Sequence, residues 1–254
     1  MNLRLDLAYD GAPFRGYARQ ADQRTVQGEL EAALGRFAQG APVRTFVAGR
    51  TDAGVHAIGQ VVSWPDAPDS LDIPTVRDAV NRICGPSIVV TDARPADPGF
   101  HARFSALSRT YIYAVLERPA PDPWLSKVAL WHPLPLDVAA MQEGAGHLLG
   151  SHDFSSFGRV AEGTPPTRTL FELSCTRSGD VIRIVARANA FIQQMVRALA
   201  GTLLEVGVGK RDPDEMPGIL AARDRGAAGV VAPPHALCLV AVEYDEGWSS
   251  PRVV

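Results

Sequence analysis

Hydrophobic and polar residues alternate along many short stretches of the chain, and a period of two residues predicts half-buried strands. The first stretch places Leu3, Leu5 and Leu7 on one face. In the stretch 58–64, Ile58, Val61, Val62 and Trp64 are expected to face a core. The same criterion predicts strands over residues 43–49, 87–95, 108–117, 169–177, 180–188 and 236–244, with a hairpin turn at Ser178-Gly179.

Other stretches have apolar residues three or four positions apart, which is the spacing of an amphipathic helix. One such helix begins at Thr25 and ends at Gly40, and a second begins at Pro74 with Val76, Val80 and Ile83 inward. Residues 136–150 form a third, with Asp137 as its N-cap. The strongest pattern covers 190–207, with Phe191, Met195, Leu199 and Leu203 on one face, and a short helix follows Pro213.

Both halves of the chain therefore contain several strands and two longer helices, and hairpin-like connections join the strands. This order favours an α+β fold over a doubly wound parallel sheet. We expect two similar halves, each a mostly antiparallel sheet with helices packed on one face. We expect an N-terminal domain over 1–106 and a C-terminal domain over 107–254.

Length and composition are those of an ordinary globular protein, with 254 residues and no apolar run long enough for a membrane helix. Three widely spaced cysteines form no disulfide framework, and no export signal precedes the first strand, so we expect a cytoplasmic protein. The net charge of −3 argues mildly against a nucleic-acid partner. All basic residues but Lys127 and Lys210 are arginine, so a polyanion would need a local arginine-rich surface.

Common cofactor and metal motifs are missing from the sequence. No glycine-rich dinucleotide fingerprint opens a helix, and the Walker A pattern fails around Gly209-Lys210, where Leu204 and Arg211 stand at required glycine and hydroxyl positions. No His-Glu-x-x-His zinc motif and no Gly-x-Ser-x-Gly elbow occur. We therefore expect no nucleotide cofactor, no other cofactor and no metal.

A charged loop with the sequence GRTDAGVHA precedes the strand that ends at Trp64. It sets Arg50 and Asp52 two residues apart between glycines. An aspartate beside glycine is a common turn residue, and spacing alone favours that structural role over a catalytic one.

The loop resembles the signature of the tRNA pseudouridine synthase A family, in which this aspartate is catalytic. Further resemblances follow in the family's order, so the similarity covers nearly the whole chain. They are AYDGAPFRGYARQ, FHARFSALSRTYIYAV, GSHDFSSF, TRTL, ANAFIQQMVRALAGTLLEVG and LCLVAVEY. The chain departs from the family pattern at Tyr17-Ala18, Cys84-Gly85 and Ala236, none of which is assigned to the chemistry.

The resemblance implies a homodimeric enzyme that isomerises uridine to pseudouridine in the anticodon stem-loop of tRNA, at positions 38, 39 and 40. It implies an active-site cleft between the two halves and Asp52 as the catalytic carboxylate. Whether this carboxylate attacks C1′ or the base, or removes a ribose proton to give a glycal, stays open. Either route needs it ionised, so a buried Asp52 would need a nearby cation.

The resemblance also suggests the residues around Asp52. Arg197 is the expected cation, and Arg50 is expected to contact an RNA phosphate or displace the flipped base. Tyr111 resembles the family's active-site tyrosine, whose ring can stack on uracil, although pattern alone would place it with Tyr113 in a core. Weaker candidates for RNA contact are His56, His101 and Arg103.

Three other functions are compatible with parts of the sequence. The first is a tRNA-binding protein or chaperone without turnover, which would not need the carboxylate. The second is a hydrolase with Asp52 as nucleophile, which would need a second acid or a metal cluster. The third is a pseudouridine synthase that acts on ribosomal or small RNAs.

Overall fold

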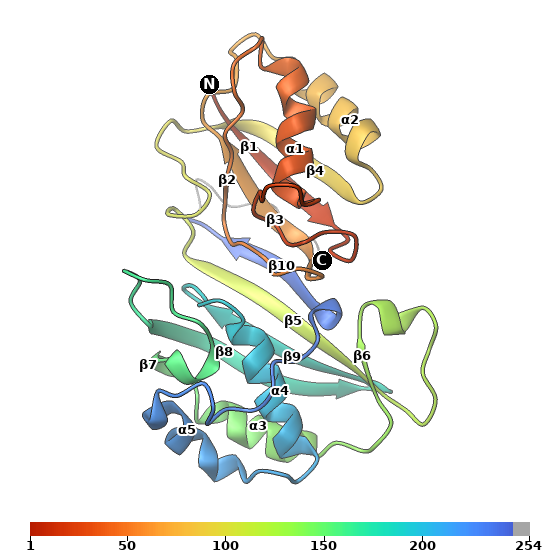
Figure 1. Cartoon of the computed structure of the whole chain (residues 1–254), viewed down its shortest axis with the longest axis vertical. Helices are drawn as coiled ribbons and strands as arrows, with labels where there is room; N and C mark the ends of the chain where they lie inside the picture. The colour runs from red at the N-terminus through yellow and green to blue at the C-terminus, as the bar shows by residue number, and fades with distance from the viewer. Residues whose placement is uncertain (246–254) are drawn as a thin grey trace. The chain divides into compact units, whose positions relative to one another are not determined.

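The computed structural model describes residues 1–245, which form two compact units. Unit 1 is Met1–Arg109 together with the segment from Leu239, and unit 2 is Thr110–Cys238. Each unit has its own helices and strands (Figure 1). The predicted boundary near residue 106 stays a prediction.

Unit 1 is built on an antiparallel arrangement in which β1 (Asn2–Tyr9) pairs with β3 (His56–Trp64) and with β4 (Ile88–Ala96). The strand order is β4-β1-β3-β10, where β10 is Leu237–Glu243. The predicted strand over 43–49 is confirmed only as the short β2 (Phe46–Val47), which pairs with β3.

Two helices belong to unit 1, and they pack against each other while α2 also contacts β4 (Figure 1). Helix α1 (Val26–Leu34) begins where the Thr25 hydroxyl accepts a hydrogen bond from the Gly28 amide at 3.2 Å. Helix α2 (Ile73–Cys84) buries Val76, Val80 and Cys84.

Two residues predicted to face this core do not. Ile83 is 41% exposed because the buried stripe of α2 advances by four residues each turn and reaches Cys84 instead. Ile58 is 58% exposed, although Val61, Val62 and Trp64 are buried as predicted. Its neighbour Ala57 is buried, so Ile58 points to the opposite face of β3 at this position.

Unit 2 contains the strand order β5-β9-β8-β7, from β5 (Ser108–Glu117), β9 (Val181–Ala188), β8 (Thr167–Ser178) and β7 (Gly150–Asp153). The predicted β8–β9 hairpin is confirmed, and Gly179 adopts φ +58° in its turn. The short β6 (Leu130–His132) runs parallel to β5 and was not predicted.

The helices of unit 2 are α3 (Val138–Gly146), α4 (Met195–Gly207) and α5 (Met216–Ala222). Asp137 caps α3 as predicted, accepting from the Ala140 amide at 3.0 Å. The predicted start of α4 near residue 190 is wrong, because Gln194 takes the left-handed conformation at φ +67° and its neighbour Gln193 bridges to Arg159. Single 3₁₀ turns occur at Gly35–Phe37, Leu125–Lys127, Ser155–Phe157, Pro213–Glu215 and Pro234–Ala236.

These elements confirm a mixed α+β fold in which strand pairing is mostly antiparallel. No helix within residues 1–245 is both long and apolar enough to cross a membrane.

Candidate active site

The loop that carries Asp52 (the Asp52 loop, residues 49–55) connects β2 and β3 in unit 1. The Val55 amide donates to the Asp52 carbonyl at 3.1 Å and closes a turn. Gly54 has φ +80° within it, a conformation that glycine adopts without strain. The backbone of Asp52 therefore does have a turn role, and its side chain extends from a closed loop.

Hydrogen bonds from buried polar side chains of β1 and β3 hold the Asp52 loop in place. The Thr51 hydroxyl lies 2.8 Å from the Tyr9 hydroxyl. The Gln60 amide nitrogen donates to Tyr9 Oη at 3.2 Å and to the Gly49 carbonyl at 2.8 Å. A buried polar group without a partner would cost free energy, so these hydrogen bonds favour one arrangement of the loop.

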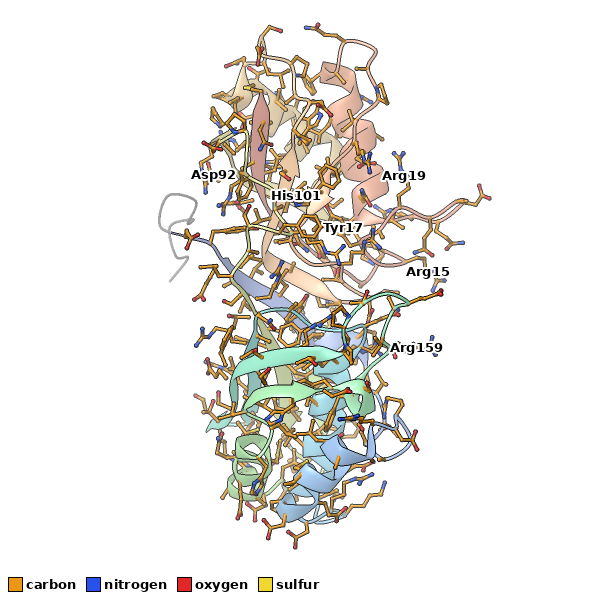
Figure 2. The ribbon with its side chains drawn as sticks, turned by 90° about the vertical axis from the view of Figure 1, so that its left-hand side faces the viewer. Arg15, Tyr17, Arg19, Asp92, His101 and Arg159 are labelled. Atoms are coloured by element: carbon orange, nitrogen blue, oxygen red, sulfur yellow. The ribbon has the colours of Figure 1, made fainter. Side chains whose placement is uncertain are left out.

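A second loop, residues 10–24, packs against the Asp52 loop. The Tyr17 amide donates to the Thr51 carbonyl at 3.1 Å. Gly11 is so close to Val55 that a Cβ atom on it would lie 2.0 Å from the Val55 carbonyl oxygen. Tyr17 points back into unit 1, whereas Arg15 and Arg19 point outward from this loop (Figure 2).

Exposure differs between the two charged residues of the Asp52 loop. The Asp52 side chain is half-buried, and Arg50 is exposed. Arg50 is thus accessible to a large charged ligand, while Asp52 lies partly within the protein. Their roles as catalytic carboxylate and RNA contact stay predictions.

His56, the first residue of β3, connects the two loops. Its Nδ1 atom accepts from the Gly11 amide at 3.0 Å and lies 3.1 Å from an Asp10 carboxylate oxygen. The His56 side chain is only 12% exposed. These contacts favour a positioning role, and the predicted contact of His56 with RNA stays a prediction.

The other two main candidates, Tyr111 and Arg197, belong to unit 2. Tyr111 on β5 is 7% exposed and makes an edge-on contact with Phe191, with ring centroids 5.3 Å apart. Arg197 is half-buried in the first turn of α4, where its Nε donates to the Ala232 carbonyl at 2.7 Å. Burial raises the pKa of the neighbouring Tyr113 hydroxyl, and the positive charge of Arg197 opposes that rise.

The chain is similar to known proteins over nearly its whole length. A family model described as tRNA pseudouridine synthase matches residues 145–245. A protein of Frankia casuarinae named tRNA pseudouridine synthase A is 45% identical over 246 residues, covering 96% of this chain and 89% of the relative. Proteins of the same name from Paramagnetospirillum magneticum and Brevibacillus brevis are 46% and 43% identical, covering 95% of this chain and 94% and 99% of those proteins. The chain belongs to the tRNA pseudouridine synthase A family.

One residue of this family member that sequence reasoning missed is Arg109, which is 7% exposed. Its guanidinium donates to the carbonyls of Ala48 at 2.9 Å, Arg103 at 2.6 Å and Ala106 at 3.1 Å. It thereby ties the segment that holds His101 and Arg103 to the residue preceding the Asp52 loop. The sequence did contain a sign of this role, because Arg109 lies on the same face of the strand as Tyr111 and Tyr113 and was therefore expected to be buried.

Among the residues that the structure describes, no three His, Cys, Asp or Glu side chains gather in a way that could hold a metal ion.

Proposed function

We propose that this member of the family isomerises uridine to pseudouridine in the anticodon stem-loop of tRNA, at positions 38, 39 and 40, with Asp52 as the catalytic carboxylate. The relatives it resembles over nearly its whole length are named tRNA pseudouridine synthase A. The observation that carries the assignment of Asp52 is the half-buried carboxylate on a loop fixed from both sides.

The reaction balances without an oxidant, a reductant or a second substrate. The bond between ribose C1′ and base N1 breaks, the uracil rotates, and a bond forms between C1′ and C5. The C5 proton is lost and N1 gains one. The protein must supply a carboxylate near the ribose, hold the detached base and assist removal of the C5 proton.

Asp52 could act as a nucleophile or as a base at the ribose, and both routes require the ionised form. A cation close to a carboxylate favours that form. We propose Arg197 as that cation. Its Nε bond to the Ala232 carbonyl would fix the guanidinium in one position.

Tyr111 is proposed to stack on the uracil and to assist proton removal at C5. Its ring lies perpendicular to that of Phe191, and an aromatic ring can stack on a uracil that has left its neighbours. As the family resemblance implies, Asp52 from unit 1 and Tyr111 and Arg197 from unit 2 would act together in a cleft between the units.

The target uridine must leave its stack to reach a half-buried carboxylate. Base flipping costs a few kcal/mol and least where a base is already unpaired or near a stem end, as in a stem-loop. Recognition of the surrounding RNA would rest on shape and phosphate contacts, with exposed Arg15 and Arg50 available for them. Binding should therefore weaken as the salt concentration rises.

We further propose that the protein is a cytoplasmic homodimer. We also propose that residues 124–134, which we call the β5–β6 region, contribute to the dimer interface. Several large apolar side chains are exposed there between residues 124 and 134. Trp124 is 76% exposed and Leu134 is 61% exposed, and both would leave water on association. The others are Leu125, Val128 and Trp131.

Trp124→Glu is expected to raise the dimer dissociation constant by roughly 30-fold, because a buried tryptophan commonly contributes about 2 kcal/mol or more to an interface. Light scattering coupled to gel filtration across a concentration series would measure the change. Val230→Glu is the control, since Val230 is 71% exposed in the same unit but outside this segment. Equal dimerisation of both variants would remove the β5–β6 region from the interface.

Release of tritium from RNA labelled at uridine C5 tests the proposed reaction directly, because the C5 hydrogen leaves only if the base rejoins through C5. We expect the wild type to release it from tRNA and not from a ribosomal RNA fragment. Binding of tRNA without release would favour a tRNA chaperone. Release from ribosomal RNA alone would move the substrate to another RNA class.

A further inference from the structure

Three aromatic rings form a contiguous cluster on unit 1 that the proposed chemistry does not use. We call Phe46, His101 and Phe104 the aromatic cluster. The His101 ring centroid lies 4.5 Å from that of Phe46 and 4.5 Å from that of Phe104. Phe104 is 76% exposed, so a large apolar ring faces solvent at the end of the cluster. An exposed ring that continues a cluster of rings is a candidate binding surface.

Two exposed arginines lie over the outer rings of the cluster. The Arg44 guanidinium is 5.2 Å from the Phe46 ring centroid, and that of Arg103 is 5.5 Å from the Phe104 centroid. Neither arginine has a salt bridge to a carboxylate among those found in the described residues. The surface therefore combines an exposed aromatic face with positive charge at both ends.

Hydrogen bonds fix the turn that carries His101 and Phe104. The Ala102 amide donates to Ser63 Oγ at 3.2 Å, and the Tyr244 hydroxyl donates to the Ala102 carbonyl at 2.7 Å. The Ser105 amide donates to the His101 carbonyl at 2.9 Å. A ring on such a turn loses little conformational entropy when a ligand stacks on it.

The surroundings of the His101 imidazole favour its neutral form. Its Nδ1 atom accepts from the Arg103 amide at 3.1 Å and from the Phe104 amide at 3.4 Å, so that nitrogen carries no proton. Burial lowers the pKa of His101, a backbone hydrogen bond opposes part of that shift, and the charge of Arg103 adds to it. The cluster thus presents uncharged rings, and its positive charge comes from the arginines.

We propose that the aromatic cluster, with Arg44 and Arg103, binds an unpaired nucleotide of the RNA substrate, with the base stacked on Phe104 and a neighbouring phosphate at the guanidinium groups. Exposed aromatic side chains interleaved with arginines are how proteins bind single-stranded RNA, because every base has a face to stack and a phosphate beside it. That this RNA is tRNA rests on the proposed function.

Hydrogen bonds of Arg109 connect the aromatic cluster to the Asp52 loop. Arg109 donates to the carbonyl of Arg103 and to that of Ala48, the residue before the loop begins. A nucleotide held on Phe104 would therefore be positioned by the same guanidinium that fixes the entry to the loop. The stacked nucleotide would lie outside the reaction and help to place the target uridine.

Phe104→Leu is expected to weaken binding of a tRNA transcript by roughly 5- to 150-fold, the range measured for loss of one stacked base. Phe104→Trp should bind at least as tightly as the wild type, because the larger ring restores the stacking surface. Fluorescence anisotropy of labelled tRNA measures the affinity, and this measurement does not depend on turnover. A failure of the proposed reaction would therefore not affect the result.

Phe171→Leu is the matched control. Phe171 is 44% exposed and also has an arginine over its ring, with Arg187 at 5.4 Å, but it lies in unit 2. The same change there should leave the affinity for tRNA within twofold of the wild type. Equal affinities for the wild type and Phe104→Leu would overturn the proposal, as would equal losses in Phe104→Leu and Phe171→Leu.

The salt dependence of binding separates stacking from charge. Arg44→Gln should reduce the slope of log Kd against log salt by about 0.7–0.9, the value for one lost phosphate contact. Phe104→Leu should shift the line without changing its slope. A slope unchanged in Arg44→Gln would remove the phosphate contact from the proposal.

Discussion

Asp52→Asn is expected to lower kcat for pseudouridine formation by roughly 10²–10⁴-fold or more while leaving the affinity for tRNA nearly unchanged. Asparagine has almost the shape of aspartate but cannot ionise, so it can neither attack the ribose or base nor remove a proton. The turn is expected to survive, because the Val55 amide bonds to the backbone carbonyl of residue 52 and not to its side chain. Tritium release and anisotropy measure the two quantities separately.

Asp66→Asn makes the same chemical change at an exposed aspartate of unit 1 and should leave both quantities unaltered. Thermal unfolding of each variant checks that the fold is intact. If Asp52→Asn released tritium at the rate of the wild type, Asp52 would have only the structural role in the turn and no catalytic one.

Gly11→Ala is expected to destabilise unit 1 by about 1–3 kcal/mol or more and to lower kcat/KM by on the order of 10²-fold. The added methyl carbon would lie 2.0 Å from the Val55 carbonyl oxygen and 2.4 Å from its carbon. Neither backbone can yield without moving the Asp52 loop, and small displacements at a reacting centre are costly. Chemical denaturation and tritium release measure the two effects.

Gly35→Ala is the matched control for this change. Gly35 has helical φ and ψ of −57° and −25°, and a Cβ atom there meets nothing within 4 Å. We expect it to stabilise the protein by about 0.5–1 kcal/mol, since alanine loses less backbone entropy on folding. If Gly11→Ala and Gly35→Ala had the same effect on stability and on kcat/KM, the close packing of Gly11 against Val55 would not be what positions the Asp52 loop.

Periodicity predicted most of the elements because the residues of each strand or helix face one core. The predicted strand over 108–117 has the same bounds as β5, and Asp137 caps α3 as expected. Elements whose form depends on distant partners were missed. The start of α4 moved to Met195 because Gln193 bridges to Arg159, and no local pattern reports such a bridge.

The candidate site was predictable in part, for a similar reason. The motif located Asp52, but spacing could not show what holds the loop in place. That support comes from Gln60 and Tyr9 on two strands and from Arg109 far along the chain. Such contacts are set by the tertiary fold, so only the structure could reveal them.

The return of β10 to unit 1 has a consequence for the order of folding during synthesis. Unit 2 is an insertion within unit 1, because the residues from Leu239 belong with Met1–Arg109. Strand β10 lies next to β3 and approaches it so closely that a Cβ on Gly59 would be 2.2 Å from the Val240 carbonyl oxygen. A ribosome makes β3 long before β10, so part of the β3 edge stays uncovered until all of unit 2 has been made and β10 follows it. Synthesis of unit 1 therefore begins before that of unit 2 and ends after it.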